Sequence, residues 1–242
     1  MPDQPSDEHA DQFQQLFWAT METASQSSRS SDLGKTRSLV MEALSTAERT
    51  EHPARNKIIA LGFFGQCLEA QGRKHEAADA FEEALSWLKD VANLQDHTFA
   101  LTLQHIAFYH LGGLNEFDKA VTLQRTASEV LDQILPEGDG DRAFSLYRLG
   151  ELLYLNDQND DAELTLNEAL DAVKASENPD CALMVMISEL LGDNCKTKRE
   201  YDQAERHYEH AFSMVKRLLP EREDLLERIA NRVQSLRASR NA

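Results

Sequence analysis

The chain repeats one short pattern four times at an almost constant interval. Each copy has two alanines seven residues apart, and the first alanines of successive copies lie 43, 42 and 42 residues apart. A period of this size is typical of solenoids, in which each repeat is one small unit that buries its apolar face against its neighbours. The sequence therefore predicts a stack of repeats with one continuous core. The alanine pairs are Ala77/Ala84, Ala120/Ala127, Ala162/Ala169 and Ala204/Ala211.

Each repeat contains two segments with helical spacing of apolar residues. Residues 142–156 and 160–173 show this spacing on either side of a polar break, and segments rich in Pro, Gly and Asp separate the repeats. A glycine stands in the first segment, 12 residues before the first alanine of a pair, where two small residues let helices approach closely. Phe108 takes that place in the third repeat, which predicts looser packing there. The glycines are Gly65, Gly150 and Gly192.

The remaining segments extend the prediction to five antiparallel hairpins and a final helix. Residues 11–23 and 31–50 are expected to form the first hairpin. Residues 221–240 carry one apolar stripe and a basic, polar opposite side, which is typical of the capping helix that such stacks require. We therefore expect an acidic tail at residues 1–10, repeats at 11–220, and a capping helix with a basic tail at 221–242.

The pattern resembles the tetratricopeptide family, whose repeat is a helix hairpin. Leu149-Gly150 and Leu191-Gly192 match the Leu-Gly of the family's first helix, and Ala204–Tyr208–Ala211 matches the second. The period exceeds the family's usual length of about 34 residues, and the long linkers resemble those of kinesin light chain. The resemblance covers about residues 58–218. It implies an all-α, right-handed solenoid of stacked hairpins that binds other proteins.

Charge and cysteine content narrow the classes of partner and compartment. The net charge is −17, although the last 27 residues carry +3. An acidic body repels phosphate, so we expect neither nucleic acid nor a membrane as partner. Three cysteines without a CxxC motif favour a reducing cytoplasm. The acidic N-terminus has no signal-peptide pattern, and no apolar run is long enough to span a membrane.

The sequence contains no motif that indicates an enzyme, a cofactor or a metal site. It has no phosphate-binding glycine loop, no GxSxG and no HExxH. His207 and His210 lie three residues apart on one helix, which could hold a metal but is more typical of solvated surface histidines. Cys195 occupies an apolar position of the repeat and is expected to be a small buried hydrophobe.

The face lined by the first helix of each hairpin is the candidate binding site that the resemblance implies. Aromatic residues cluster there with acids, which favours a protein or peptide segment of basic or apolar character. Packing of the aromatics between neighbouring hairpins is the alternative interpretation. The candidate residues are His105, Tyr109, Phe144, Tyr147, Arg148, Glu151, Tyr154, Glu189 and Asp193.

These features predict a non-enzymatic scaffold for protein–protein interaction, with no cofactor. Two further interpretations remain open at this point. One is a regulatory protein that senses a ligand or peptide and acts by titrating another protein. The other is a structural protein that self-assembles through its ends.

Overall fold

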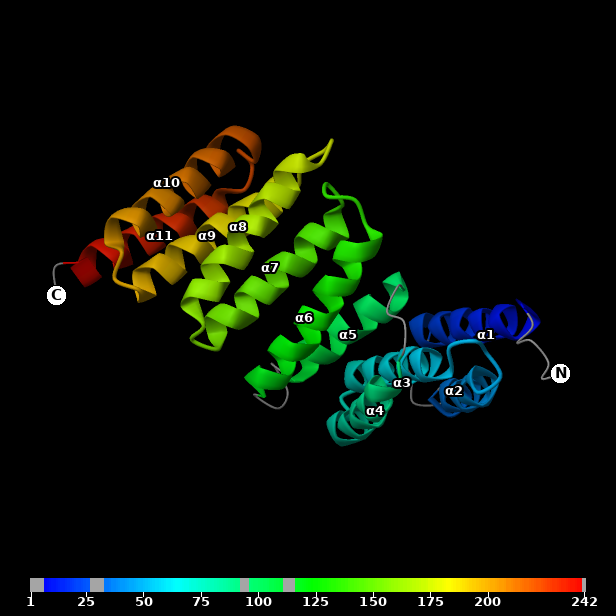
Figure 1. Cartoon of the computed structure of the whole chain (residues 1–242). Coiled ribbons are helices and arrows are strands. Elements are labelled where there is room, and N and C mark those ends of the chain that lie inside the picture. Colours follow the sequence, from blue (N-terminus) through cyan, green and yellow to red (C-terminus); the bar gives the residue numbers. More distant parts are fainter. Residues whose placement is uncertain (1–6, 27–32, 92–95, 111–115, 241–242) are drawn as a thin grey trace. The chain divides into compact units, whose positions relative to one another are not determined.

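A computed structural model of the chain describes residues 7–26, 33–91, 96–110 and 116–240. These residues form helices and contain no strand (Figure 1), so the predicted all-α fold is confirmed. The chain divides into two compact units, Met1–Asn115 and Glu116–Ala242. Most of the predicted acidic tail, residues 1–6, lies outside the described residues, as do the last two residues of the predicted basic tail.

In the first unit, α3 is the central helix of the described residues and packs against three of its neighbours. α1 packs on α2, α2 packs on α3, and α3 contacts both α4 and α5. A short 3-10 helix, η1, follows α4. The elements are α1 (Asp7–Gln26), α2 (Leu33–Ala47), α3 (Pro53–Ala70), α4 (Lys74–Ser86), η1 (Leu88–Asp90) and α5 (His97–Tyr109).

The second unit is a regular stack in which each helix packs on the next along the chain (Figure 1). α7 and α8 form one hairpin, α9 and α10 form the next, and α11 packs on α10. α7 also contacts α9, because both are first helices of their hairpins. The elements are α6 (Phe117–Ile134), α7 (Gly140–Leu155), α8 (Asn159–Ala175), α9 (Cys181–Thr197), α10 (Tyr201–Leu218) and α11 (Glu223–Arg240).

The predicted third hairpin falls on the boundary between the two units. Its first helix, α5, packs against α3 in the first unit, whereas its second helix, α6, packs against α7 in the second. Phe108, which replaces the expected glycine in α5, has 48% of its surface exposed. Its connecting segment, residues 111–115, lies outside the described residues. The other four predicted hairpins each lie within one unit.

Small residues set the spacing between paired helices, as predicted. All eight alanines of the repeat pattern have no exposed surface. A Cβ atom added to Gly192 would lie 2.5 Å from Cε1 of Tyr208, and one added to Gly150 would lie 2.6 Å from Cγ of Leu166. Since real Cβ atoms do not approach other atoms so closely, these helix pairs require glycine at this point.

Local hydrogen bonds explain where the first helices begin. The Asp139 carboxylate accepts bonds from the backbone N–H groups of Asp141 and Arg142, at 2.8 and 3.4 Å. Asp180 caps α9 in the same way, with bonds from Ala182 and Leu183 at 2.8 and 3.0 Å. A side-chain acceptor here satisfies N–H groups that have no partner within the helix. The linkers that the sequence marked as breaks therefore start α7 and α9.

The hairpin turns repeat one backbone conformation. Gly72, Asp157 and Arg199 follow the first helix of their hairpins with positive φ angles of 74°, 58° and 63°. This left-handed conformation lets the next N–H group bond back to the helix, as Gln158 N does to Leu153 O at 2.9 Å. The recurrence after 42 residues, from Asp157 to Arg199, follows the repeat period.

Candidate functional site

The predicted site residues fall in both units, so the structure describes them as two groups. His105 and Tyr109 lie on α5 in the first unit. Tyr109 is buried: its ring centroid lies 4.6 Å from that of Phe81, and its hydroxyl donates to Lys74 O at 2.9 Å. This is the alternative role, in which an aromatic residue packs neighbouring hairpins together. His105 is half-buried, with Nε2 3.5 Å from Oε2 of Glu69; burial lowers its pKa, while Glu69 acts in the opposite sense.

The aromatic residues of the second unit differ in exposure along α7. Tyr147 is buried in the core between α7, α8 and α9, and burial raises its pKa to about 12. Phe144 lies next to it, with 6.0 Å between ring centroids, but keeps 44% of its surface exposed. Tyr154 is half-buried, and its hydroxyl lies 3.4 Å from Oγ1 of Thr197 on α9. Phe144 is therefore the most accessible of the three rings.

The three predicted acids are each paired with an arginine of the same chain. Arg148 donates to Glu151 at 2.5 Å along α7. Arg228, from α11, places Nε 3.0 Å from Glu189 Oε1 and a second nitrogen on Oε2, which makes a two-pronged bond. Glu189 itself is almost completely buried. Each of these carboxylates is therefore already paired with a positive charge of the chain itself, whereas the sequence analysis expected the acids to attract a basic partner.

Asp193 joins the same network from α9. Its carboxylate accepts a hydrogen bond from Arg232 and another, at 2.6 Å, from the hydroxyl of Tyr208. Nε of Arg232 also lies 3.2 Å from Oε1 of Glu189. Burial and the bond to Asp193 both raise the pKa of Tyr208, so its hydroxyl remains a donor at neutral pH. The network ties α11 to α9 through charge as well as packing.

These contacts define one surface, which we call the α7–α9–α11 face. Its solvent-exposed parts are two apolar side chains and the guanidinium groups of Arg228 and Arg232, whereas the Arg148 side chain is only 19% exposed. The charges of Arg148, Glu151, Glu189 and Arg228 all act on the Tyr147 hydroxyl, which places them in one neighbourhood. Met186, three residues before Glu189 on α9, is 38% exposed. The face comprises Phe144, Arg148, Met186, Arg228 and Arg232.

Arg228 and Arg232 were not among the residues predicted for the site. A signal for them exists in the sequence: they lie four residues apart on α11, as Glu189 and Asp193 do on α9, and 39 residues separate each pair. α11 also starts 42 residues after α9, so it takes the place of the first helix of a further repeat. Two arginines one turn apart therefore face two acids one turn apart.

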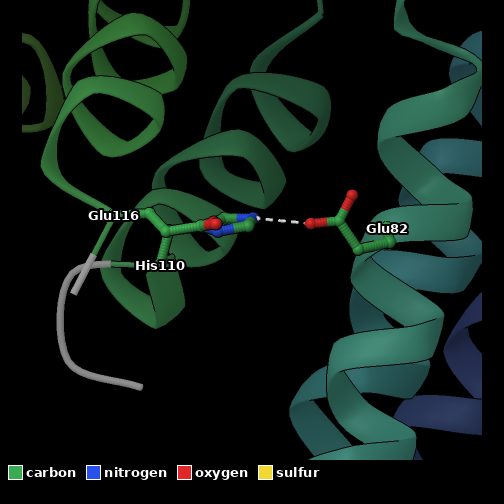
Figure 2. A group of neighbouring side chains, drawn as sticks. All are labelled: Glu82, His110 and Glu116. Carbon is green, nitrogen blue, oxygen red and sulfur yellow. Dashed lines mark ion pairs between the residues drawn. The ribbon is translucent and has the colours of Figure 1, made fainter. Parts of the chain in front are cut away.

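Other chemically reactive side chains serve the fold. Cys67 and Cys195 are buried, as expected for Cys195, and burial raises the pKa of each thiol to about 11. Nδ1 of His210 lies 3.5 Å from Oγ of Ser188 on α9. In the first unit, Nε2 of the fully buried His110 lies 4.0 Å from Oε1 of Glu82 on α4, a contact that the sequence did not predict (Figure 2).

None of the helices in the described part of the chain combines the length and the apolar character that a bilayer span needs.

Comparisons with known proteins place the chain among helical-repeat proteins. Residues 59–87 and 141–217 match models of the tetratricopeptide repeat. A search of curated proteins finds no match to the sequence. Solved structures do match, and 62 chains resemble this one.

Three of these structures illustrate the likeness. BtubC (BKLC) from P. vanneervenii is 22% identical with a TM-score of 0.63, over 77% of this chain and 74% of that one. A putative kinesin light chain from Podosopora anserina with TPR-like repeats is 13% identical, TM-score 0.62, over 86% and 97%. A Rap protein complexed with Competence and Sporulation Factor is 12% identical, TM-score 0.50, over 97% and 78%. Identities this low show the fold alone. Together with the repeat models, they show that the chain contains tetratricopeptide-type repeats at residues 59–87 and 141–217 within an all-α helical-repeat fold.

Proposed function

We propose that this chain is a non-enzymatic scaffold that binds a protein or peptide segment on the α7–α9–α11 face. One observation carries the proposal: Phe144 and Met186 are exposed apolar side chains at the same position of successive first helices, 42 residues apart. An apolar side chain that a partner covers contributes more to binding than a charge at the rim. A rigid helical stack also holds the two anchors in place before binding, which lowers the ordering cost.

The arginine pairs change the kind of segment that fits this face. A basic segment would have to displace Arg148, Arg228 or Arg232 to reach the carboxylates. The pairing therefore removes the reason for expecting a basic partner, while the apolar anchors remain.

The two other interpretations receive less support. Self-assembly through the C-terminal end would need an apolar surface on the outer side of α11, but Glu227, Asn231 and Gln234 are exposed there. A role as a ligand-sensing regulator draws only on likeness of fold.

Selection of peptides from a random display library against the intact chain tests the proposal. Peptides that bind wild type should lose affinity by about tenfold or more for Phe144→Ser/Met186→Ser, which corresponds to about 1.4 kcal/mol. The matched control is Leu164→Ser/Phe212→Ser, which removes two exposed apolar side chains from the second helices α8 and α10. Loss of binding in the control alone would place the site on the second helices and refute the proposal.

A further inference from the structure

α11 continues the register of the first helices, with arginines at the positions that line the α7–α9–α11 face. Positions 144, 186 and 228 hold Phe144, Met186 and Arg228, and positions 148, 190 and 232 hold Arg148, Leu190 and Arg232. Along this face the exposed side chains therefore change from apolar to cationic toward the C-terminal end. A segment that lies along the face meets both kinds of side chain in turn.

The two acids of α9, Glu189 and Asp193, lie beneath the arginines of α11. The Glu189 side chain is 5% exposed and the Asp193 side chain 20%, against 47% for Arg228 and 36% for Arg232. A charge that reaches solvent acts on a partner more strongly than one that is covered and paired. The surface at this end of the face is therefore cationic, although its formal charges nearly cancel.

The buried carboxylate prepares the guanidinium for a second partner. The two bonds to Glu189 use two of the five N–H donors of Arg228, and the side chain remains half exposed. A guanidinium that is already fixed loses less rotamer entropy when it binds another carboxylate. Arg232 is held by a single bond to Asp193, and its Nε lies 3.2 Å from Oε1 of Glu189.

A fourth cation strengthens the sign of this surface. Lys196, on α9, bonds through Nζ to the Ser235 hydroxyl of α11 at 2.9 Å. Four cations, counting Arg148, therefore stand against the three acids of the network. On a chain with a net charge of −17, this is a local reversal of sign, of the kind that gives an interface its specificity.

We propose that the α7–α9–α11 face binds an acidic protein segment in which carboxylates alternate with apolar side chains. The apolar side chains contact Phe144 and Met186, and the carboxylates bind the outer N–H groups of Arg228 and Arg232. This inference rests on the proposed function and specifies its partner. The proposed partner has the opposite charge to the basic segment that the carboxylates of this face alone would favour.

Two synthetic peptides test the charge that the face prefers in its partner. Each has about ten residues, which in an extended conformation spans two or three first helices. Both carry the same apolar residues, with Glu at every charged position in one and Lys in the other. Fluorescence polarisation with the wild-type chain should give an affinity for the acidic peptide at least about tenfold above that for the basic one. Equal affinity, preference for the basic peptide, or no binding of either peptide overturns the inference.

A paired substitution locates the effect without leaving a buried charge. Arg228→Gln/Glu189→Gln removes both partners of the bond and should lower the affinity for the acidic peptide about fivefold or more. The matched control is Arg237→Gln/Glu205→Gln, which removes another α11 ion pair, 2.8 Å long and directed to α10, and should leave binding unchanged. Equal losses in both variants contradict a site at Arg228.

Two further results keep the inference separate from the proposed function. Arg228→Lys keeps the charge without the two-pronged bond and should bind the acidic peptide better than the Gln pair. If basic peptides bind and depend on Phe144 and Met186, the inference fails while the proposed function stands. If no bound peptide depends on these two residues, both fail.

Discussion

Gly192→Ala tests the close approach of paired helices, which underlies the whole repeat assignment. The added Cβ would lie 2.5, 2.7 and 2.9 Å from three carbons of the Tyr208 ring. That ring has no exposed surface, so it can move only by disturbing its neighbours. Movement would also strain the 2.6 Å hydrogen bond from its hydroxyl to Asp193.

The expected change in the free energy of unfolding combines two destabilising effects and one stabilising effect. Overpacking a well-packed core costs about 1–3 kcal/mol. Loss of the hydrogen bond adds about 1 kcal/mol. Alanine is better than glycine inside a helix by about 1 kcal/mol, which acts in the opposite direction. We therefore expect the free energy of unfolding of the second unit to fall by about 1–3 kcal/mol.

Urea unfolding followed by circular dichroism measures this change, with Gly140→Ala as the control. Gly140 begins α7 in the same unit, and a Cβ added there meets nothing within 4 Å. The control should be unchanged or stabilised by up to about 1 kcal/mol. If Gly192→Ala is as stable as the control, the helices do not need glycine at their contact and the reasoning is wrong.

Three more predictions follow from the same structure. Truncation after Pro220 removes α11 and uncovers the apolar side of α10, so the melting temperature should fall and aggregation should rise, because burial of apolar surface contributes about 25 cal/mol per Å²; an unchanged monomer would disprove the capping role. Burial raises the pKa of Tyr147 to about 12, above about 10 for a free phenol. The protonated hydroxyl therefore contributes its full stabilisation below about pH 10, and this stabilisation is lost as the pH rises through about 12. Tyr147→Phe has no hydroxyl to ionise, so it should lose less stability over that pH range than the wild type. In thiol titration of the native protein at pH 8, Cys181 should react first, while the buried Cys67 and Cys195 should react only on unfolding.

The repeat period predicted much of the fold because it reflects local contacts. Alanine pairs and glycines at fixed intervals are the residues at which two helices touch, so their spacing identifies the hairpins directly. The structure confirms this at Gly65, Gly150 and Gly192. Phe108 breaks the pattern, and the helices predicted as that hairpin pack within different units.

The site was harder to predict because exposure depends on neighbouring helices. Tyr109 and Phe144 both occupy inward positions of the pattern, yet one is buried against Phe81 and the other is exposed. The pairing of Glu189 with Arg228 joins side chains 39 residues apart. A count of charges along the chain could not show which of the two partners faces solvent.

Methionine methyl groups offer the most direct test of binding on the α7–α9–α11 face. Met186 lies on this face, whereas Met214 is buried in α10 and Met41 is exposed in the first unit. We would record the NMR spectrum of the chain labelled with ¹³C-methyl methionine while adding the acidic peptide. The account predicts a saturable shift of the Met186 signal, with the signals of Met41 and Met214 unmoved. A saturable shift of Met41 or Met214 while Met186 stays in place would contradict it.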